Sequence, residues 1–183
     1  MSYQILSLKY RPQSFDDVVG QTHVTQTLVN AFKKERVAQG YIFTGPRGVG
    51  KTTTARIMAK GLNCSDSKNG QPCNDCTVCN EITESRNLDV LEIDGASNRG
   101  IEEIRNLREL IKFTPMNAPY KIFIIDEVHM LTNPALNASR ILPSDFLAIA
   151  STEALSDCNF SLLIILFIVS LITSIGRRWK SNR

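Results

Sequence analysis

The sequence has little net charge and lacks a long apolar stretch at its start. Its formal charge is +3, from 21 Lys and Arg against 18 Asp and Glu, whereas proteins that bind nucleic acid commonly carry a dense basic face. Charge alone therefore does not indicate a polyanion-binding protein. Residues 1–21 carry charged side chains where a secretory signal peptide requires an apolar core. We therefore expect a cytoplasmic protein.

The composition lacks the bias of a disordered or fibrous chain. Its 43% hydrophobic and 21% charged residues are typical of a folded domain. A length of 183 residues is enough for one domain of common size but crowded for two. Five cysteines are present, and in a cytoplasmic protein closely spaced thiols favour a metal site over disulfides.

Short apolar runs alternate with stretches of helical character along the first 125 residues. The predicted strands are 41–44, 90–94 and 122–125, and the predicted helices are 22–34, 52–62 and 98–111. This alternation indicates parallel βαβ units joined by right-handed crossovers. The segment 8–21, broken by Pro12 and Gly20, is predicted to be extended or turning.

Residues 45–52 match the phosphate-binding pattern G-x-x-x-x-G-K-[ST] and lie between a predicted strand and a predicted helix. The glycines allow backbone N–H groups to converge on phosphates, and the helix N-terminus adds partial positive charge. Lys51 would contact the outer phosphates and Thr52 would bind magnesium. A plain glycine-rich turn is the alternative, but it does not require this register. The predicted residues for ATP or another nucleoside triphosphate are Gly45, Pro46, Arg47, Gly48, Val49, Gly50, Lys51, Thr52 and Thr53.

Two adjacent carboxylates, Asp126 and Glu127, follow the predicted strand 122–125. Asp126 would hold magnesium, usually through water, and Glu127 would polarise the attacking water. In an arbitrary chain such a strand end is often a solvated turn. Together with the phosphate-binding loop, it predicts a P-loop NTPase whose catalytic residues are Lys51, Asp126 and Glu127.

Four of the cysteines follow the pattern C-x8-C-x2-C-x2-C at Cys64, Cys73, Cys76 and Cys79. Four thiolates can surround one tetrahedral zinc ion, and the polar segment 63–80 would fold poorly without such a staple. An iron–sulfur cluster is an alternative, although the trailing Cys-Pro of the bacterial ferredoxin pattern is missing. Unliganded or disulfide-bonded cysteines are a further alternative. Cys158 stands apart and is interpreted as an ordinary thiol.

These residues together resemble the N-terminal part of the bacterial DNA polymerase III gamma/tau family, the AAA+ motor subunits of the sliding-clamp loader. The matching motifs are Leu8–Pro12, Phe15–Gln21, Gly45–Thr52, the four cysteines, Asp94–Asn98 and Asp126–Leu131. The resemblance implies an α/β P-loop NTPase (AAA+) fold, with a parallel sheet flanked by helices and a small inserted zinc-binding module over 63–80. We expect residues 1–131 to form an incomplete AAA+ ATPase domain.

The resemblance also implies roles that spacing alone does not. Arg11, Val18 and Val19 would lie near the adenine, and the four cysteines would bind structural zinc. Arg99 would contact the DNA backbone, with a plain helix-capping turn as the alternative. ATP binding would drive assembly with the other clamp-loader subunits, which open the sliding clamp and place it on primed DNA beside the DNA-directed DNA polymerase. The implied cofactors are ATP, Mg²⁺ and Zn²⁺.

The tail 132–183 departs from the family pattern. The sequence shows no Ser-Arg-Cys motif, and the run 146–152 is interpreted as only a chance resemblance to a strand that ends at a sensor threonine. Residues 160–175 are sixteen residues without a charge, which as a helix would reach roughly 24 Å, short of the ~30 Å of a bilayer core. The tail is interpreted as a membrane segment, as a truncated or frame-shifted end, or as a surrogate core element.

The tail also bears on activity. The missing arginine normally stabilises the transition state of a neighbouring subunit's ATP site and can contribute ~10³ or more in rate, so we expect impaired hydrolysis. Two functional alternatives therefore remain beside a clamp-loader ATPase. One is a nucleotide-binding interaction module without turnover, and the other is a membrane-tethered P-loop NTPase.

Overall fold

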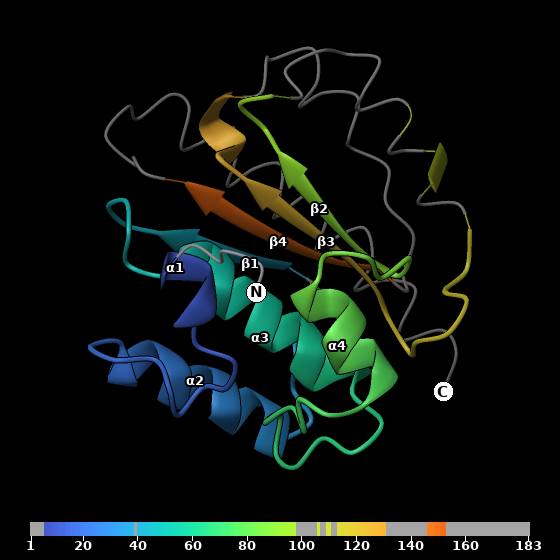
Figure 1. Cartoon of the computed structure of the whole chain (residues 1–183), viewed down its shortest axis with the longest axis horizontal. Helices are drawn as coiled ribbons and strands as arrows, with labels where there is room; N and C mark the ends of the chain where they lie inside the picture. The colour runs from blue at the N-terminus through green and yellow to red at the C-terminus, as the bar shows by residue number, and fades with distance from the viewer. Residues whose placement is uncertain are drawn as a thin grey trace.

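The centre of the molecule is a parallel sheet of four strands. A computed structural model describes residues 6–38, 40–97, 106, 109–110, 113–130 and 146–152, and within 146–152 it describes the side chains of Ile149 and Ser151. The strands are β1 (Gly40–Thr44), β2 (Val90–Asp94), β3 (Lys121–Asp126) and β4 (Phe146–Thr152). They lie in the order β1-β4-β3-β2, and every pairing is parallel (Figure 1). The predicted α/β fold with a parallel sheet is confirmed.

The helices are α1 (Leu6–Lys9), α2 (Thr22–Lys33), α3 (Lys51–Asn63), α4 (Thr77–Thr83) and a short 3-10 helix, η1 (Val128–Met130). The bounds of α2 and α3 agree with the predicted helices to within a residue or two. α1 is a correction, because residues 8 and 9 were expected to be extended or turning. A single helical turn precedes the break at Pro12. The predicted helix 98–111 falls largely outside the described residues.

The run 146–152 forms β4, and the interpretation of it as a chance resemblance is wrong. β4 lies between β1 and β3, with Thr44 opposite Thr152 and Lys121 opposite Phe146. Without a strand in this position, β1 and β3 would each leave a row of backbone N–H and C=O groups without partners. The tail therefore supplies a central strand of the described sheet.

The rest of the tail, 132–145 and 153–183, lies outside the described residues. This part includes Cys158 and the apolar segment 160–175, so its three interpretations stay predictions. Among the helices that the structure does describe, none has the length and apolar character needed to cross a membrane.

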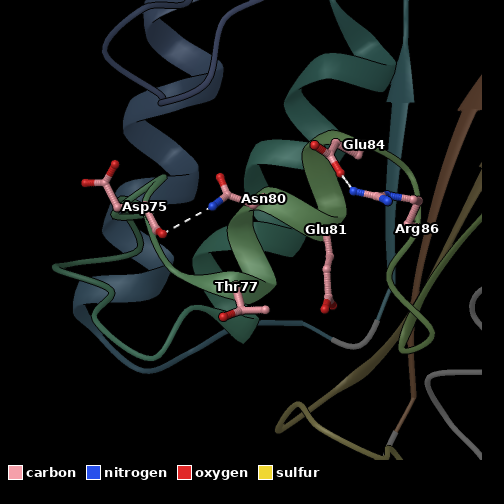
Figure 2. A pocket seen from close by; sticks show the side chains of 6 residues that line it. All are labelled: Asp75, Thr77, Asn80, Glu81, Glu84 and Arg86. Carbon is pink, nitrogen blue, oxygen red and sulfur yellow. Dashed lines mark hydrogen bonds and ion pairs between the residues drawn. The ribbon is translucent and has the colours of Figure 1, made fainter.

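α4 was not predicted. It begins at Thr77, between the last two cysteines of the pattern. Cys76 is its N-cap and accepts a hydrogen bond from the Cys79 amide. Cys79 and Ile82 face inward, whereas the outer surface lines an open polar pocket (Figure 2). In that pocket Asn80 Nδ2 donates to the Asp75 carbonyl at 3.2 Å, and Arg86 pairs with Glu84. The remaining lining residues are Thr77 and Glu81.

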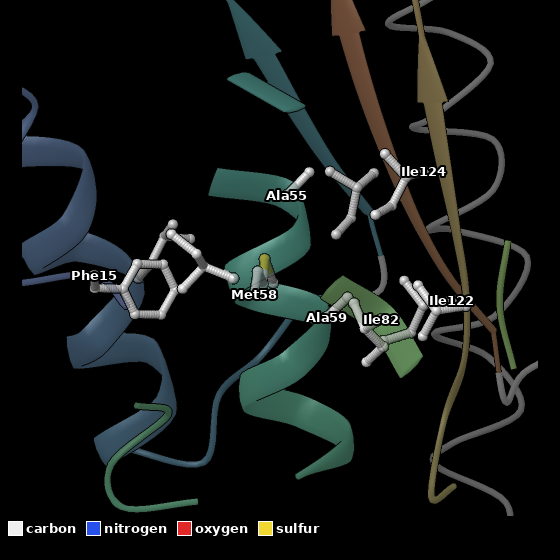
Figure 3. Close-up of a cluster of buried hydrophobic side chains, with 11 residues drawn as sticks. Phe15, Ala55, Met58, Ala59, Ile82, Ile122 and Ile124 are labelled. Atoms are coloured by element: carbon white, nitrogen blue, oxygen red, sulfur yellow. The ribbon is translucent and has the colours of Figure 1, made fainter. Parts of the chain in front are cut away.

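α3 is buried on two sides, between the sheet and α2 (Figure 1). Ala55 and Ala59 face Ile122 and Ile124 of β3, and their small side chains allow the helix to approach the sheet closely (Figure 3). On the opposite side, Met58 and Phe15 extend the core toward α2. The core cluster is Phe15, Leu28, Ala55, Ile57, Met58, Ala59, Ile82, Val90, Ile122, Ile124 and Ile149.

The cysteine-rich segment is packed tightly onto α2 and α3. A Cβ atom at Gly61 of α3 would overlap the carbonyl oxygen of Gly70, and one at Gly70 would overlap the Phe32 ring of α2. Gly70 also has a φ of +79°, which side chains rarely adopt. The Phe15 amide donates to Gln71 Oε1 at 3.1 Å. Segment 63–80 is therefore a docked part of the domain.

Candidate nucleotide site and cysteine cluster

The loop between β1 and α3 carries the predicted phosphate-binding motif. Gly48 and Gly50 have φ values of +80° and +91°, and Gly50 is the N-cap of α3. Left-handed residues in a turn orient successive N–H groups into one concavity, and the first N–H groups of a helix have no intrahelical partner. The arrangement therefore offers a cluster of backbone donors suited to an anion.

Lys51 folds back over this loop. Its Nζ donates to the carbonyl oxygens of Gly45 and Pro46 at 2.8 and 2.9 Å. The ammonium is thus held beside the backbone donors, where a full positive charge adds to their partial charges.

Asp126 connects the loop to the carboxyl end of the sheet. Thr52 Oγ1 donates to Asp126 Oδ2 at 2.6 Å, although the two residues are 74 positions apart. Ser151 of β4 donates to Asp126 Oδ1. Burial alone would raise the pKa of Asp126, but hydrogen bonds from Ser151 and Thr52 outweigh it, and the pKa lies below its ordinary value. The carboxylate is therefore ionised at neutral pH and has the charge that a divalent cation requires.

Glu127 lies beside the same site in an uncommon backbone conformation, with a φ of +50°. Its Oε1 lies 3.9 Å from a guanidinium nitrogen of Arg47, and its Oε2 lies 3.4 Å from Nε2 of His129. Within the described part of the chain, this buried Oε2 accepts no hydrogen bond. A buried carboxylate oxygen that accepts no hydrogen bond is costly, and His129 can offset its charge when the imidazole is protonated.

The predicted catalytic residues lie near one another, since Glu127 follows Asp126 and the charge of Lys51 acts on Asp126. Of the residues expected near the adenine, Arg11 is half-buried. Burial lowers its pKa and so does the charge of Arg56, whereas Glu92 raises it. Val18 packs against the core, and Val19 is 93% exposed. The adenine contact stays a prediction, and Arg99 lies outside the described residues.

Two interactions between distant residues were missed in the sequence: that of Ser151 with Asp126 and that of Arg56 with Glu92. Ser151 was not considered, because the strand that carries it was not accepted as a strand. The available signal was the run 146–152, whose small and β-branched residues suit a strand paired on both sides in a sheet. The ion pair between Arg56 and Glu92, with nitrogen–oxygen hydrogen bonds of 2.8 Å, ties α3 to β2. No spacing rule joins positions 36 residues apart.

The four predicted cysteine ligands lie together. Their Sγ atoms are all within 4.8 Å of one another, with 3.4 Å between Cys64 and Cys73 and 3.9 Å between Cys64 and Cys76. All four are free cysteines. In a tetrahedral site with Zn–S bonds of about 2.3 Å, sulfur atoms are separated by about 3.8 Å. The cluster therefore has the dimensions of a single-ion site.

Backbone amides point at each of the four sulfur atoms. The amide of each of the last three cysteines donates to the sulfur of the cysteine before it in the pattern, at 3.3–3.5 Å: Cys73 N to Cys64 Sγ, Cys76 N to Cys73 Sγ, and Cys79 N to Cys76 Sγ. The Asn74 amide donates to Cys79. Such donors stabilise thiolates in preference to thiols. The chain around the sulfurs is therefore arranged for charged ligands.

The thiols differ in acidity. The pKa of Cys76 is raised by burial but lowered more by the Cys79 amide and the neighbouring thiols, and lies at about 6. Burial raises the pKa of Cys64 and of Cys79. Without a cation, burial therefore favours the thiol form of Cys64 and Cys79, and a bound cation would have to displace those protons.

Comparison with known proteins places this chain in a family. The model of the family described as "DNA polymerase III, delta subunit" matches residues 20–140. The DNA polymerase III subunit tau of Bacillus subtilis is 51% identical over 138 residues, which are 75% of this chain and 24% of that protein. The tau subunit of Escherichia coli is 46% identical over 138 residues, which are 75% of this chain and 22% of that protein. The gamma subunit of Buchnera aphidicola from Acyrthosiphon pisum is 44% identical over 38% of its length.

Among solved structures, a DNA polymerase III gamma subunit-related protein of Thermotoga maritima is 19% identical, with a TM-score of 0.44 over 70% of this chain and 38% of that one. The RuvB Holliday junction branch migration motor of Thermotoga maritima is 19% identical, with a TM-score of 0.49 over 78% and 42%. The chain spans less than two fifths of the length of each curated relative given above. On the family model, the chain belongs to the DNA polymerase III delta-subunit family, and the predicted resemblance to gamma and tau subunits is confirmed.

Proposed function

We propose that this chain binds Mg²⁺-ATP at residues 45–52 and serves as an ATP-binding subunit of the bacterial DNA polymerase III clamp loader. In that role it would couple ATP binding and hydrolysis to placement of the sliding clamp on primed DNA. The observation that carries the proposal is the 2.6 Å hydrogen bond between Thr52 and Asp126. It brings the two residues suited to magnesium together at the mouth of the phosphate-binding loop.

Each residue of the site has a distinct part in the proposed reaction. The N–H groups around Gly48 and Gly50, with the Lys51 ammonium, would bind the phosphates. Thr52 and Asp126 would hold Mg²⁺, which neutralises charge on the outer phosphate oxygens when it is bound. Glu127 would orient the attacking water and accept its proton on a carboxylate oxygen. His129 and Arg47 would hold Glu127 in place.

Titration with nucleotide tests the proposal directly. Replacement Lys51→Ala removes the mobile cation, and a hydrogen bond to a charged group contributes about 1.5–3 kcal/mol. We therefore expect Mg²⁺-dependent ATP affinity to fall by roughly ten- to 150-fold. Lys68→Ala, which removes an exposed lysine from the cysteine-rich segment, is the matched control and should bind as the wild type does. Equal affinity in wild type and Lys51→Ala would refute the assignment.

A second candidate function is a nucleotide-responsive interaction module without turnover. Steady-state ATPase measurement with clamp and primed DNA separates the two functions. Stimulated turnover that vanishes in Lys51→Ala supports the motor, whereas tight binding without turnover supports the module.

We further propose that the four cysteines bind one structural zinc ion. The close approach of the sulfur atoms supports a single ion, because a multi-iron cluster requires room for bridging sulfides between its ligands. Metal analysis of reduced, chelator-free protein tests this assignment. About one zinc per chain supports it, and less than about half a zinc per chain, or the visible absorption of iron–sulfur, contradicts it.

The proposed functional unit comprises residues 1–131 together with β4. Its proposed partners are the other clamp-loader subunits, the sliding clamp and, through the assembly, primed DNA. A cytoplasmic location is proposed with that machinery.

A further inference from the structure

Lys60 of α3 is a lysine in the interior of the protein. Only 2% of it is exposed, and lysine is almost never so buried unless its charge is paired. It lies one helical turn before Cys64, the first predicted metal ligand. Neither the phosphate site nor the predicted zinc ligand set uses it.

The hydrogen-bond partners of Lys60 are neutral. Its Nζ donates to Gln13 Oε1 at 2.5 Å and to Asn74 Oδ1 at 3.2 Å. In the described part of the chain it forms no ion pair with a carboxylate. Two amide oxygens satisfy the donors of the ammonium but do not offset its charge.

The groups that would favour the charge of this ammonium, once they are thiolates, are the cysteines. Cys79, Cys73 and Cys76 all favour its charge, whereas burial and Arg56 oppose it. Asn74, which accepts from Lys60, lies within the Cys-x2-Cys turn, and its own amide donates to Cys79. The ammonium is therefore hydrogen-bonded to the turn that carries Cys73 and Cys76.

The charges of the two groups are complementary. Four thiolates and one divalent cation carry a net charge of −2, and burying that charge away from water is costly. A buried ammonium without an anion is costly for the same reason. Placed side by side in the protein interior, each charge lowers the cost of the other, because their attraction is weakly screened there.

From this placement, and resting on the proposed zinc site, we infer that Lys60 is the internal counter-ion of a metal-bound four-thiolate centre. It is a positioning residue, since it acts on the metal through its charge and through Asn74, without being a ligand.

The inference has a consequence for the N-terminal segment. Gln13, the other acceptor of Lys60, donates from Nε2 to the Arg11 carbonyl at 2.9 Å. Thr83 of α4 also donates to Gln13 Oε1, at 3.4 Å. The same ammonium therefore joins the cysteine cluster to the segment that carries Arg11.

Zinc affinity of the full chain, measured by competition with a chromophoric chelator, tests the inference. Lys60→Gln removes the charge and keeps a hydrogen-bond donor, Lys60→Met removes both, and Lys60→Arg restores the charge. We expect zinc affinity to fall about ten- to 100-fold in the first two variants, which is typical for loss of a residue that supports metal ligands. Lys60→Arg should remain within a few-fold of the wild type. Lys68→Gln, the same change at an exposed lysine of the module, should have no effect.

Two results would overturn the inference. One is zinc affinity in Lys60→Gln equal to that of the wild type. The other is a loss in Lys60→Arg as large as in Lys60→Met, which would indicate a role of shape and not of charge. If Lys60→Met does not fold in excess zinc, Lys60→Gln and Lys60→Arg decide the question. A wild-type chain without zinc refutes the metal assignment itself, whereas one zinc per chain with an unaffected Lys60→Gln refutes the counter-ion alone.

Discussion

Asp126 is the residue on which the candidate nucleotide site converges. It accepts hydrogen bonds from the Thr52 and Ser151 hydroxyls and from the Glu127 amide, the last at 3.0 Å. These donors come from α3, β4 and the end of β3. A carboxylate held in this way is kept ionised and fixed in orientation, which are the properties a magnesium ligand needs before the metal arrives.

Replacement Asp126→Asn should reduce stability in a pH-dependent way. The pKa of Asp126 is lowered in the folded protein, so its ionised form stabilises the fold above its ordinary pKa, and this contribution is lost as the pH falls through the lowered value. We therefore expect a constant stability difference between wild type and variant from about pH 5 to 8, and a shrinking difference below about pH 4. Chemical unfolding at several pH values measures it.

Asp16→Asn is the control for this prediction, because it removes an exposed carboxylate that has no role in the site. A stability difference for Asp126→Asn that grows on acidification would contradict the assignment of Asp126 as an ionised hydrogen-bond acceptor. Magnesium affinity in the presence of ATP should fall in Asp126→Asn and not in the control.

At the scale of elements, α3 connects the two candidate sites. Its N-terminus begins at the phosphate-binding loop and its last turn leads into Cys64. Asn63 fixes that end to the sheet, because its side-chain amide donates to the Tyr120 carbonyl at 2.9 Å and accepts from the Tyr120 amide at 3.0 Å. The helix is thus a rigid link between the loop and the cysteine cluster.

Replacement Gly61→Ala should destabilise the protein, although alanine has a higher helix propensity than glycine. Propensity alone favours alanine in a helix interior by about 1 kcal/mol. At Gly61, however, a Cβ would overlap the backbone of Gly70, and overpacking of this kind costs about 1–3 kcal/mol. Thermal unfolding with zinc present measures the balance. A melting temperature higher than that of the wild type would show that segment 63–80 is not seated on α3 as described.

The elements differ in how well sequence predicts them. α2 and α3 were placed within a residue or two, because an apolar stripe and a glycine loop define them locally. α4 was missed, because Cys76 and Cys79 were interpreted only as ligands and a seven-residue helix has little periodicity. β4 was misjudged, because its neighbours in the sheet are more than 20 residues away along the chain.

At the scale of the whole molecule, the sheet depends on residues from the divergent tail. β4 pairs with both β1 and β3, and Ile149 at its centre is completely buried in the core cluster. The carboxyl ends of β1, β3 and β4 lie at one edge, which is where ligands bind in open parallel sheets. The candidate nucleotide site is therefore complete only with β4 in place.

Replacement Ile149→Ala tests whether β4 belongs to the core. Truncating a fully buried isoleucine to alanine lowers the free energy of unfolding by about 2–5 kcal/mol, which includes the cost of the cavity left behind. We expect a loss in this range by denaturant unfolding, together with weaker ATP binding, because Ser151 lies two residues further along the same strand. Val19→Ala, at a side chain that is 93% exposed, is the control and should change stability by less than about 0.5 kcal/mol. An unchanged stability for Ile149→Ala would contradict the described sheet.

The sequence by itself determined which residues form the local part of each candidate site, and it predicted their chemistry. Contiguous motifs specify the phosphate-binding loop and the cysteine cluster, since local backbone geometry and short spacing dictate what those residues can bind. Only the tertiary structure decided which distant groups complete them. Ser151 reaches Asp126, and Lys60 reaches Asn74 in the turn between Cys73 and Cys76, because separate strands and turns pack around α3. Packing of this kind depends on burial and on pairing across the sheet, which no local pattern encodes.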